Sequence, residues 1–409
     1  MSKRIVITGI GVLSPIAIGK DAYWDGLFQG KTGFRSITLF DASSFHVSIA
    51  GEITEFDPLS FLGKKGLRDL DRSTRLICSA AKLAIDDSRI EITEHNTHSM
   101  GVSIGTTFGS LHSISQFDRS GLIDGPRFVN PSHFPNTVIN SPASQVSIRF
   151  KIKGFNTTIS TGFCASLDAF SYAADFIRLN RADVVFAGGV EELCEETFLG
   201  FHTLGCLSGS DGSTPLCCPF DARRNGVILS EGAAVLVLED EDHALNRGGA
   251  ILARVLGYSN AFDPLADSNF SQKGQGLKNA IGFALQEASL GPDDIDYISA
   301  CSNSTKGLDR METKVIKEFF GTRAFQIPIS SIKSMIGETF SASGALSLAA
   351  AVGVLQKGAV PPTINYHEKD QGCDLDYVPN HARQKQIQNV LVTAADPYGQ
   401  NSAVILGRP

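Results

Sequence analysis

Apolar and polar positions follow two distinct patterns along the chain. Short runs of β-branched and other apolar residues, typical of strands buried on both faces, occupy residues 4–8, 184–187, 234–238, 297–299 and 390–393. Longer segments with apolar residues at helical spacing lie among them, at 73–86, 164–179, 276–288 and 343–356. This alternation predicts an α/β protein in which helices cover parallel central sheets.

The best internal boundary lies near residue 250. A strand pattern ends at 238, a charged, glycine-containing stretch continues to about 250, and a new strand signal occupies 251–256. No proline-rich or low-complexity linker marks this point. We therefore expect two tightly packed halves, 1–250 and 251–409, rather than two tethered domains.

Composition narrows the class of protein. The chain has 409 residues, 42% of them hydrophobic and 19% charged, with a net charge of −7, which is typical of a folded protein with a large core. The acidic balance and the lack of basic runs argue against nucleic acid or an anionic membrane as partner. These features do not exclude a small acidic carrier protein, which could bind through a local basic patch.

Targeting signals are also missing from the pattern. The first 12 residues have two basic positions before about nine apolar ones, and we interpret them as a buried first strand rather than a signal peptide. No apolar stretch approaches the roughly 18 residues that span a bilayer. The expected location is cytoplasmic.

Cysteine and histidine usage predicts neither a disulfide scaffold nor a metal centre. The eight cysteines are sparse and include no CxxC pair, and the nine histidines form no HxxxH or His-carboxylate cluster. Most cysteines should be reduced, buried, small hydrophobic residues.

Cys164 is the candidate nucleophile. The strand-like run 158–161 breaks at Gly162, and a helical pattern starts at Ala165. A cysteine on such an elbow faces unpaired amides and a helix N-terminus, which lower the pKa of a thiol and favour its thiolate. The alternative is a small residue packed beneath a helix start.

A series of motifs gives these features a common meaning. In chain order they are Ile5-Val6-Ile7-Thr8-Gly9-Ile10-Gly11, Gly105-Thr106, the Cys164 elbow, Ala187-Gly188-Gly189, Pro219-Phe220-Asp221 with Glu231-Gly232-Ala233, Ser331-Ile332-Lys333-Ser334-Met335, Pro361-Pro362-Thr363-Ile364-Asn365 and Gly372-Cys373-Asp374-Leu375-Asp376. Their number and order are specific, although each is weak alone. Together they resemble the β-ketoacyl-acyl-carrier-protein synthases. The resemblance implies a thiolase fold, with two similar halves in a layered αβαβα arrangement, assembled as a dimer.

Two positions depart from the chemistry of that family. Its members use the cysteine to hold an acyl thioester and two histidines to decarboxylate a malonyl extender and stabilise the enolate. Where the resemblance places these histidines, this chain has Cys301 and Glu338. An ionised carboxylate repels an enolate instead of donating to it. The retained Lys333 has a supporting role in the family's hydrogen-bond network.

A third departure concerns the oxyanion hole. The family's Gly-Phe-Gly-Gly loop provides a backbone N–H to it, and a gapless alignment from Asn401 places Pro397 at the donor position. Proline has no N–H. A one-residue shift would put Tyr398 there instead.

Loss of these groups on a retained scaffold most resembles the chain-length factor, the ketosynthase-like β subunit of bacterial type II polyketide synthases. The resemblance implies a heterodimer with an active ketosynthase, no bound cofactor, and substrate delivered on the phosphopantetheine of an acyl carrier protein. Cavity-lining positions would be Phe108, Phe117, His133 and Phe134. Chain-length factors often replace the elbow cysteine, so Cys164 is here either an inactive remnant or an acyl acceptor.

Two alternatives stay open. One is an altered β-ketoacyl synthase or acyltransferase in which Cys164 accepts the acyl group. The other is a homodimeric scaffold with no polyketide role. Whether the chain is an enzyme in its own right is therefore undecided by sequence, although independent condensation is not expected.

Overall fold

Within the described residues, each half of the chain contributes five strands to the main path of the central sheet. The computed structural model describes residues 3–265 and 273–409. The strands of the first half are β1 (Ile5–Ser14), β5 (Met100–Gly105), β6 (Asn156–Ile159), β7 (Val184–Glu191) and β8 (Gly232–Asp240). Those of the second half are β9 (Ala253–Phe262), β10 (Tyr297–Ser299), β11 (Ile329–Ser330), β14 (Asn389–Ala395) and β15 (Gln400–Gly407). The short strand β2 (Ala17–Ile18) joins the same sheet by pairing with β1. Two separate pairs are formed by β3 (Phe34–Ser36) with β4 (Ile49–Gly51) and by β12 (Ala359–Val360) with β13 (Arg383–Gln384).

The two halves repeat one topology. The strands are arranged β1-β8-β7-β5-β6 in the first half and β9-β15-β14-β10-β11 in the second. If the five strands of each half are numbered by their order in the sequence, both halves have the spatial order 1-5-4-2-3. Directions repeat as well, because in each half two antiparallel pairs are followed by two parallel pairs. The similar halves expected from the resemblance are thus present.

The expected parallel character of the sheets is wrong. Each half mixes parallel and antiparallel pairs, and β1 also pairs antiparallel with β9 through Ile5↔Val255, Val6↔Arg254 and Ile7↔Ala253. This pairing joins the halves into one mixed sheet. Buried strands of either direction have similar apolar runs, so the pattern in the sequence does not determine direction. The strand predicted at 251–256 starts at Ala253.

Helices complete the layers. They are α1 (Lys20–Phe28), α2 (Pro58–Leu62), α3 (Arg72–Ser88), α4 (Leu111–Ile123), α5 (Ser141–Phe150), α6 (Ala165–Arg178), α7 (Glu195–Thr203), α8 (Glu241–Asn246), α9 (Gln275–Ala288), α10 (Lys306–Phe320), α11 (Lys333–Ile336) and α12 (Ala342–Lys357). Short 3₁₀ turns are η1 (Thr97–Ser99), η2 (Pro131–Thr137), η3 (Gly162–Cys164), η4 (Pro292–Asp294) and η5 (Gly321–Phe325).

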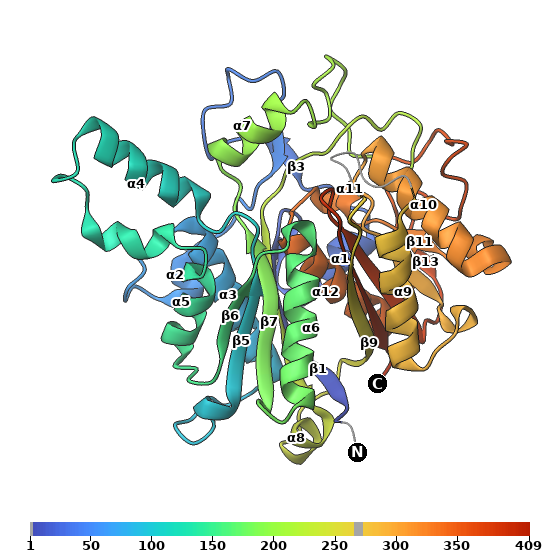
Figure 1. Ribbon diagram of the computed structural model, residues 1–409, viewed down its shortest axis with the longest axis horizontal. Helices are drawn as coiled ribbons and strands as arrows, with labels where there is room; N and C mark the ends of the chain where they lie inside the picture. The colour runs from blue at the N-terminus through green and yellow to red at the C-terminus, as the bar shows by residue number, and fades with distance from the viewer. Residues whose placement is uncertain (1–2, 266–272) are drawn as a thin grey trace.

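Three hydrophobic cores correspond to the αβαβα layers. One core packs α3 and α5 against the first half's strands, and another packs α9 and α10 against those of the second half. The central core holds α6 and α12 between the strands of the first half and those of the second half, and Figure 1 shows both helices in the middle of the molecule. Helix α12 is buried along its length from Ala342 to Leu355. The segments that precede these central helices, at Cys164 and at Glu338 to Ser341, therefore lie inside the protein.

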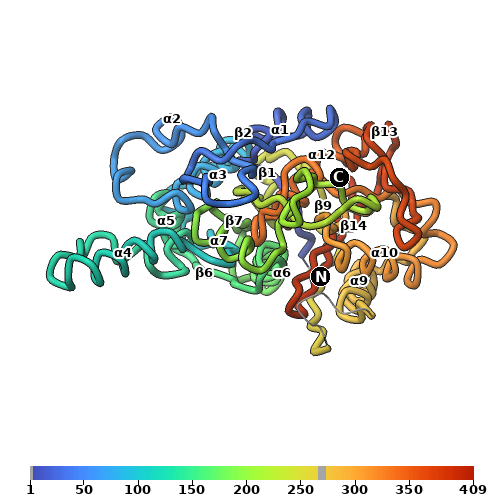
Figure 2. The backbone as a smooth tube through the Cα atoms, turned by 90° about the horizontal axis from the view of Figure 1, so that it is seen from above, coloured from blue at the N-terminus to red at the C-terminus, as the bar shows by residue number. Residues whose placement is uncertain are grey.

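One segment stands apart from these layers. Helix α4 and the η2 turn extend away from the body in both views (Figures 1 and 2). None of the α4 residues is buried. We call residues 111–139 the projecting arm. Within the described residues, none of the helices combines the length and apolarity that a bilayer crossing requires.

Candidate functional site

The Cys164 elbow forms as the sequence predicts. Strand β6 ends at Ile159, Gly162 has φ +59°, and α6 begins at Ala165 directly after Cys164. A Cβ at position 162 would lie 2.0 Å from Oδ2 of Asp396, so only glycine fits this turn. Cys164 is fully buried, and its thiol donates to the backbone oxygen of Gln400 at 3.4 Å.

The expected activation of this thiol is not present. Burial raises the pKa of Cys164 well above its ordinary value, and the nearby Asp168 and Asp396 carboxylates raise it further. A hydrogen bond with Ser402 and the charge of Lys333 oppose this shift without reversing it. Desolvation of a thiolate outweighs the helix N-terminus here. The thiol is therefore protonated at neutral pH.

Cys301 is held as a hydrogen-bonded structural residue. It follows β10, and its backbone N–H donates to Oε1 of Glu312 at 3.0 Å and to Oγ1 of Thr393 at 3.2 Å. Its thiol donates to the same Glu312 oxygen at 3.3 Å. Burial and the Glu312 carboxylate raise the pKa of Cys301 well above the ordinary thiol value. A thiol in this state does not replace an imidazole as a proton donor and acceptor near neutral pH.

Glu338 is surrounded by donors. Its Oε2 accepts from Nζ of Lys333 and Nδ2 of Asn303, both at 2.8 Å. Its Oε1 accepts from Oγ of Ser343 at 2.9 Å and from the backbone N–H of Phe340 at 3.0 Å. The residue is 1% exposed. With two donors on each oxygen, the carboxylate is fully committed to contacts within the chain.

Lys333 is the counterion of this carboxylate. It is 4% exposed. Burial alone would lower the pKa of Lys333, but attraction to the Glu338 and Glu312 carboxylates and the hydrogen bond to Glu338 outweigh burial and raise it. The two side chains form a buried salt bridge, with Nζ of Lys333 2.8 Å from Oε2 of Glu338.

The loop between β14 and β15 brings a second carboxylate to the elbow. Pro397 has no N–H, and beside it Asp396 accepts from the Phe163 amide at 3.1 Å and from the Tyr398 amide at 2.8 Å. Burial raises the pKa of Asp396, and these amides oppose the rise. The sequence reasoning missed Asp396. An acidic residue inside the loop that should supply an oxyanion-binding amide was the signal for it.

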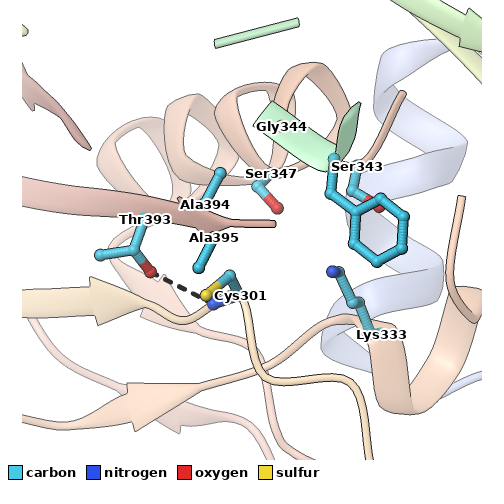
Figure 3. A pocket seen from close by; sticks show the side chains of 9 residues that line it. Cys301, Lys333, Ser343, Gly344, Ser347, Thr393, Ala394 and Ala395 are labelled. Carbon is cyan, nitrogen blue, oxygen red and sulfur yellow. Dashed lines mark hydrogen bonds between the residues drawn. The ribbon is translucent and has the colours of Figure 1, made fainter. Parts of the chain in front are cut away.

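The space left between these groups is minimal. A cavity of about 10 Å³ lies between α12 and β14, which is about the volume of one water molecule. Its lining is mixed polar and apolar, and the residues are Phe163, Cys301, Lys333, Ser343, Gly344, Ser347, Thr393, Ala394 and Ala395. Figure 3 shows these side chains around the cavity, with the contact between Thr393 and the Cys301 amide dashed. No acyl or malonyl group fits this volume.

Aromatic rings close the site toward the surface. The Phe340 ring is fully buried and lies 5.4 Å from Phe108, 5.4 Å from Phe163 and 5.0 Å from Phe201, measured between centroids. Phe108 therefore packs in a four-ring cluster instead of lining an open acyl pocket. Phe163 lies at the boundary, because it also lines an outer pocket of about 580 Å³. That pocket is further lined by Asn303, Thr305 and Pro397.

The other predicted cavity residues belong to the projecting arm. The rings of Phe117 and Phe134 lie 5.9 Å apart, Phe134 is 58% exposed, and the exposed His133 contacts Asn130. None of these three residues lines the one-water cavity or the outer pocket. Within a single chain, the structure thus brings Cys164, Cys301, Lys333, Glu338 and Pro397 into one region and leaves the arm residues outside it.

Sequence comparisons with known proteins show the family to which the chain belongs. Residues 2–244 match the family model for the beta-ketoacyl synthase N-terminal domain, and 252–367 match the C-terminal domain model. The chain is 36% identical to 3-oxoacyl-[acyl-carrier-protein] synthase 2 of Coxiella burnetii, with 99% of each chain covered. It is 38% identical to the tetracenomycin polyketide synthase ketoacyl synthase alpha subunit of Streptomyces glaucescens, covering 100% of this chain and 97% of that protein.

Solved structures agree at the level of the whole chain. The ishigamide ketosynthase/chain length factor superposes with a TM-score of 0.93 at 31% identity, covering 100% of both chains. A type II polyketide synthase acyl carrier protein in complex with its ketosynthase superposes with a TM-score of 0.92 at 29% identity, again covering 100% of both chains.

Proposed function

We propose that this chain, which belongs to the β-ketoacyl synthase family, is the chain-length factor of a type II polyketide synthase. In this role it pairs with an active ketosynthase, contributes walls to a shared polyketide cavity, and does not itself condense. Residues 1–250 form the half with the cysteine elbow, and 251–409 form the half with the altered histidine positions.

The single observation that carries the proposal is the environment of Glu338. Decarboxylative condensation requires donors that stabilise a developing enolate. At this position the Glu338 carboxylate accepts from four donors, including Lys333, the only cation among the residues that line the one-water cavity, so it withholds these donors from any enolate. None of that cavity's lining residues is a histidine.

The elbow adds a second obstacle to condensation. An oxyanion beside Cys164 would meet the Asp396 carboxylate, which already occupies the Phe163 amide. Pro397 supplies no replacement donor. Loss of one oxyanion donor typically costs about 3 kcal/mol, or roughly a hundredfold in rate.

The projecting arm is the surface that we assign to the ketosynthase partner. Large apolar side chains remain exposed on it, among them Leu122 at 86%, Phe128 at 76% and Ile123 at 69%. Strand β6 ends the sheet on the same side of the molecule (Figure 1). An apolar patch beside an open sheet edge favours a second subunit.

We assign carrier-protein docking to a basic patch at the end of α2. Lys64, Lys65 and Arg68 are exposed there around Leu59 and Leu67, which line a shallow pocket of about 410 Å³. Cations around an apolar floor suit an acidic helical partner. The substrate would arrive on the carrier's phosphopantetheine arm, and the chain itself would hold no cofactor.

Malonyl consumption tests the proposal directly. We expect the purified chain to leave malonyl-carrier protein unchanged, and the heterodimer with an intact ketosynthase to consume it. Robust condensation by the isolated chain would overturn the proposal. A chain that stays homodimeric in the presence of the ketosynthase would instead favour a scaffold role.

The retained elbow cysteine supports one second candidate, an altered synthase or acyltransferase that loads Cys164. Mass spectrometry after incubation with acyl-carrier thioesters distinguishes it. A mass increment that is lost in Cys164→Ala but kept in Cys206→Ala would establish loading of the buried thiol, because Cys206 is the exposed cysteine. No increment on Cys164, alone or in the complex, would remove this candidate.

A further inference from the structure

The donors around Glu338 form a binding site for a carboxylate group. They come from three separate segments: the loop after β10 gives Asn303, α11 gives Lys333, and the stretch around the start of α12 gives Ser343 and the Phe340 amide. Two donors meet each oxygen at 2.8–3.0 Å. Such a set of one cation and three neutral donors suits any small monocarboxylate.

The backbone that carries the Glu338 side chain is held independently of it. The Glu338 N–H donates to the Ile228 oxygen at 2.8 Å, and the Ser230 N–H donates to the Glu338 oxygen at 3.0 Å. The preceding Gly337 has φ +78°, and a Cβ there would lie 2.1 Å from Oγ of Ser230. The walls of the site should therefore persist when the side chain is shortened.

Local strain indicates that the donors are held in place for an anion. Phe340 has φ +47° although it is a bulky residue, and this left-handed conformation is disfavoured for such a side chain. This conformation accompanies the contact between its amide and Oε1 of Glu338. The carboxylates that raise the pKa of Lys333 include those of Glu338 and Glu312. Among the described residues Glu338 alone hydrogen-bonds or pairs with the Lys333 ammonium, and an unpaired buried ammonium is strongly disfavoured.

We propose that the Glu338 side chain is a built-in carboxylate ligand, which occupies a monocarboxylate site made by Lys333, Asn303, Ser343 and the Phe340 amide. By filling that site permanently, it excludes small carboxylates and the carboxylate end of an extender unit. The proposal needs only this chain, so its test is independent of any polyketide role or partner.

The size of the ligand follows from the truncation that would expose the site. Glu338→Ala keeps Cβ and removes Cγ, Cδ and both carboxylate oxygens, which are the four heavy atoms of acetate. Acetate should therefore refill the site. Formate leaves the methyl volume empty, and propionate adds a methylene that the packed site does not accept.

Thermal unfolding of the purified full chain measures this refilling. We expect E338A to gain a saturable rise in Tm of roughly 2 °C or more in 100 mM sodium acetate, compared with sodium chloride of equal ionic strength. Wild type should show no such difference, and formate and propionate should act more weakly on E338A. The double variant E338A/K333M should lose the acetate response, because the cation of the site is gone.

Two outcomes would overturn the proposal. One is no acetate-specific rise in E338A, and the other is an equal rise in wild type or in E338A/K333M. If E338A does not fold in chloride, refolding from urea decides the question. Recovery of native circular dichroism in acetate but not in chloride supports the site, and equal failure in both buffers refutes it.

Discussion

Replacing Phe128 with alanine tests the projecting arm as the partner-binding surface. The Phe128 ring is 76% exposed in the single chain. Full burial of a phenylalanine side chain is worth about 1.5–3 kcal/mol, so covering the exposed part of this ring should contribute about 1–2 kcal/mol. The variant should therefore raise the heterodimer Kd roughly 5- to 30-fold.

The design separates binding from folding. Because the ring makes little contact with the body of its own chain, Phe128→Ala should leave the urea midpoint of the isolated chain unchanged. Phe283→Ala is the matched control. That ring is 54% exposed on α9, on the outer face of the other half, and its removal should leave the Kd as it is.

The assay is sedimentation or biolayer titration of the chain with an intact type II ketosynthase. An unchanged Kd for Phe128→Ala, or an equal loss for Phe283→Ala, would contradict the assignment of the arm. Loss of affinity in Phe128→Ala together with a lower urea midpoint would point to misfolding of the arm instead.

Three further outcomes are expected. Lys333→Met should destabilise the chain by about 3–5 kcal/mol, because it leaves the buried Glu338 without its partner. Adding Glu338→Leu should restore most of that loss, because the pair is then apolar. Urea unfolding of the single and double variants checks this, and equal losses in both would contradict it. Burial raises the pKa of Glu192 from 4.5 to about 8. The stability that this protonated side chain contributes is therefore complete below about pH 4.5 and is lost as the pH rises through 8. Urea midpoints of the wild type should fall between pH 5 and 8, those of Glu192→Gln should fall less, and parallel profiles of the two proteins would refute this. Charge reversal at Lys65 and Arg68 should raise the Kd for the carrier protein, and the effect should be largest at low salt. Binding titrations at two ionic strengths check this. An unchanged Kd, or an increase that does not depend on salt, would contradict docking at this patch.

Local patterns predicted much of the fold. The helices expected at 73–86 and 276–288 are α3 and α9, whose bounds differ by two residues at most. The strand run at 390–393 lies within β14. The Cys164 elbow was also predicted, because a strand, a glycine turn and a helix start are each determined by neighbouring residues.

The prediction that Cys301 and Glu338 stand where the family has histidines came from the surrounding motifs alone and stays a prediction. The state of the groups that replace them was not readable. The expected low pKa of Cys164 failed because desolvation depends on every segment packed around the thiol.

Tertiary structure alone decided what those residues do. Strand direction in the mixed sheet follows from the crossover connections, and the pairing of β1 with β9 joins residues about 250 positions apart. Glu338 gained a role only when the fold placed Asn303, 35 positions away, within hydrogen-bond distance. Asp396 reached the Phe163 amide across 233 positions. The amino-acid order determined which chemical groups were available and where each element began, whereas burial and long-range contacts, which no local pattern encodes, set their charge and their partners.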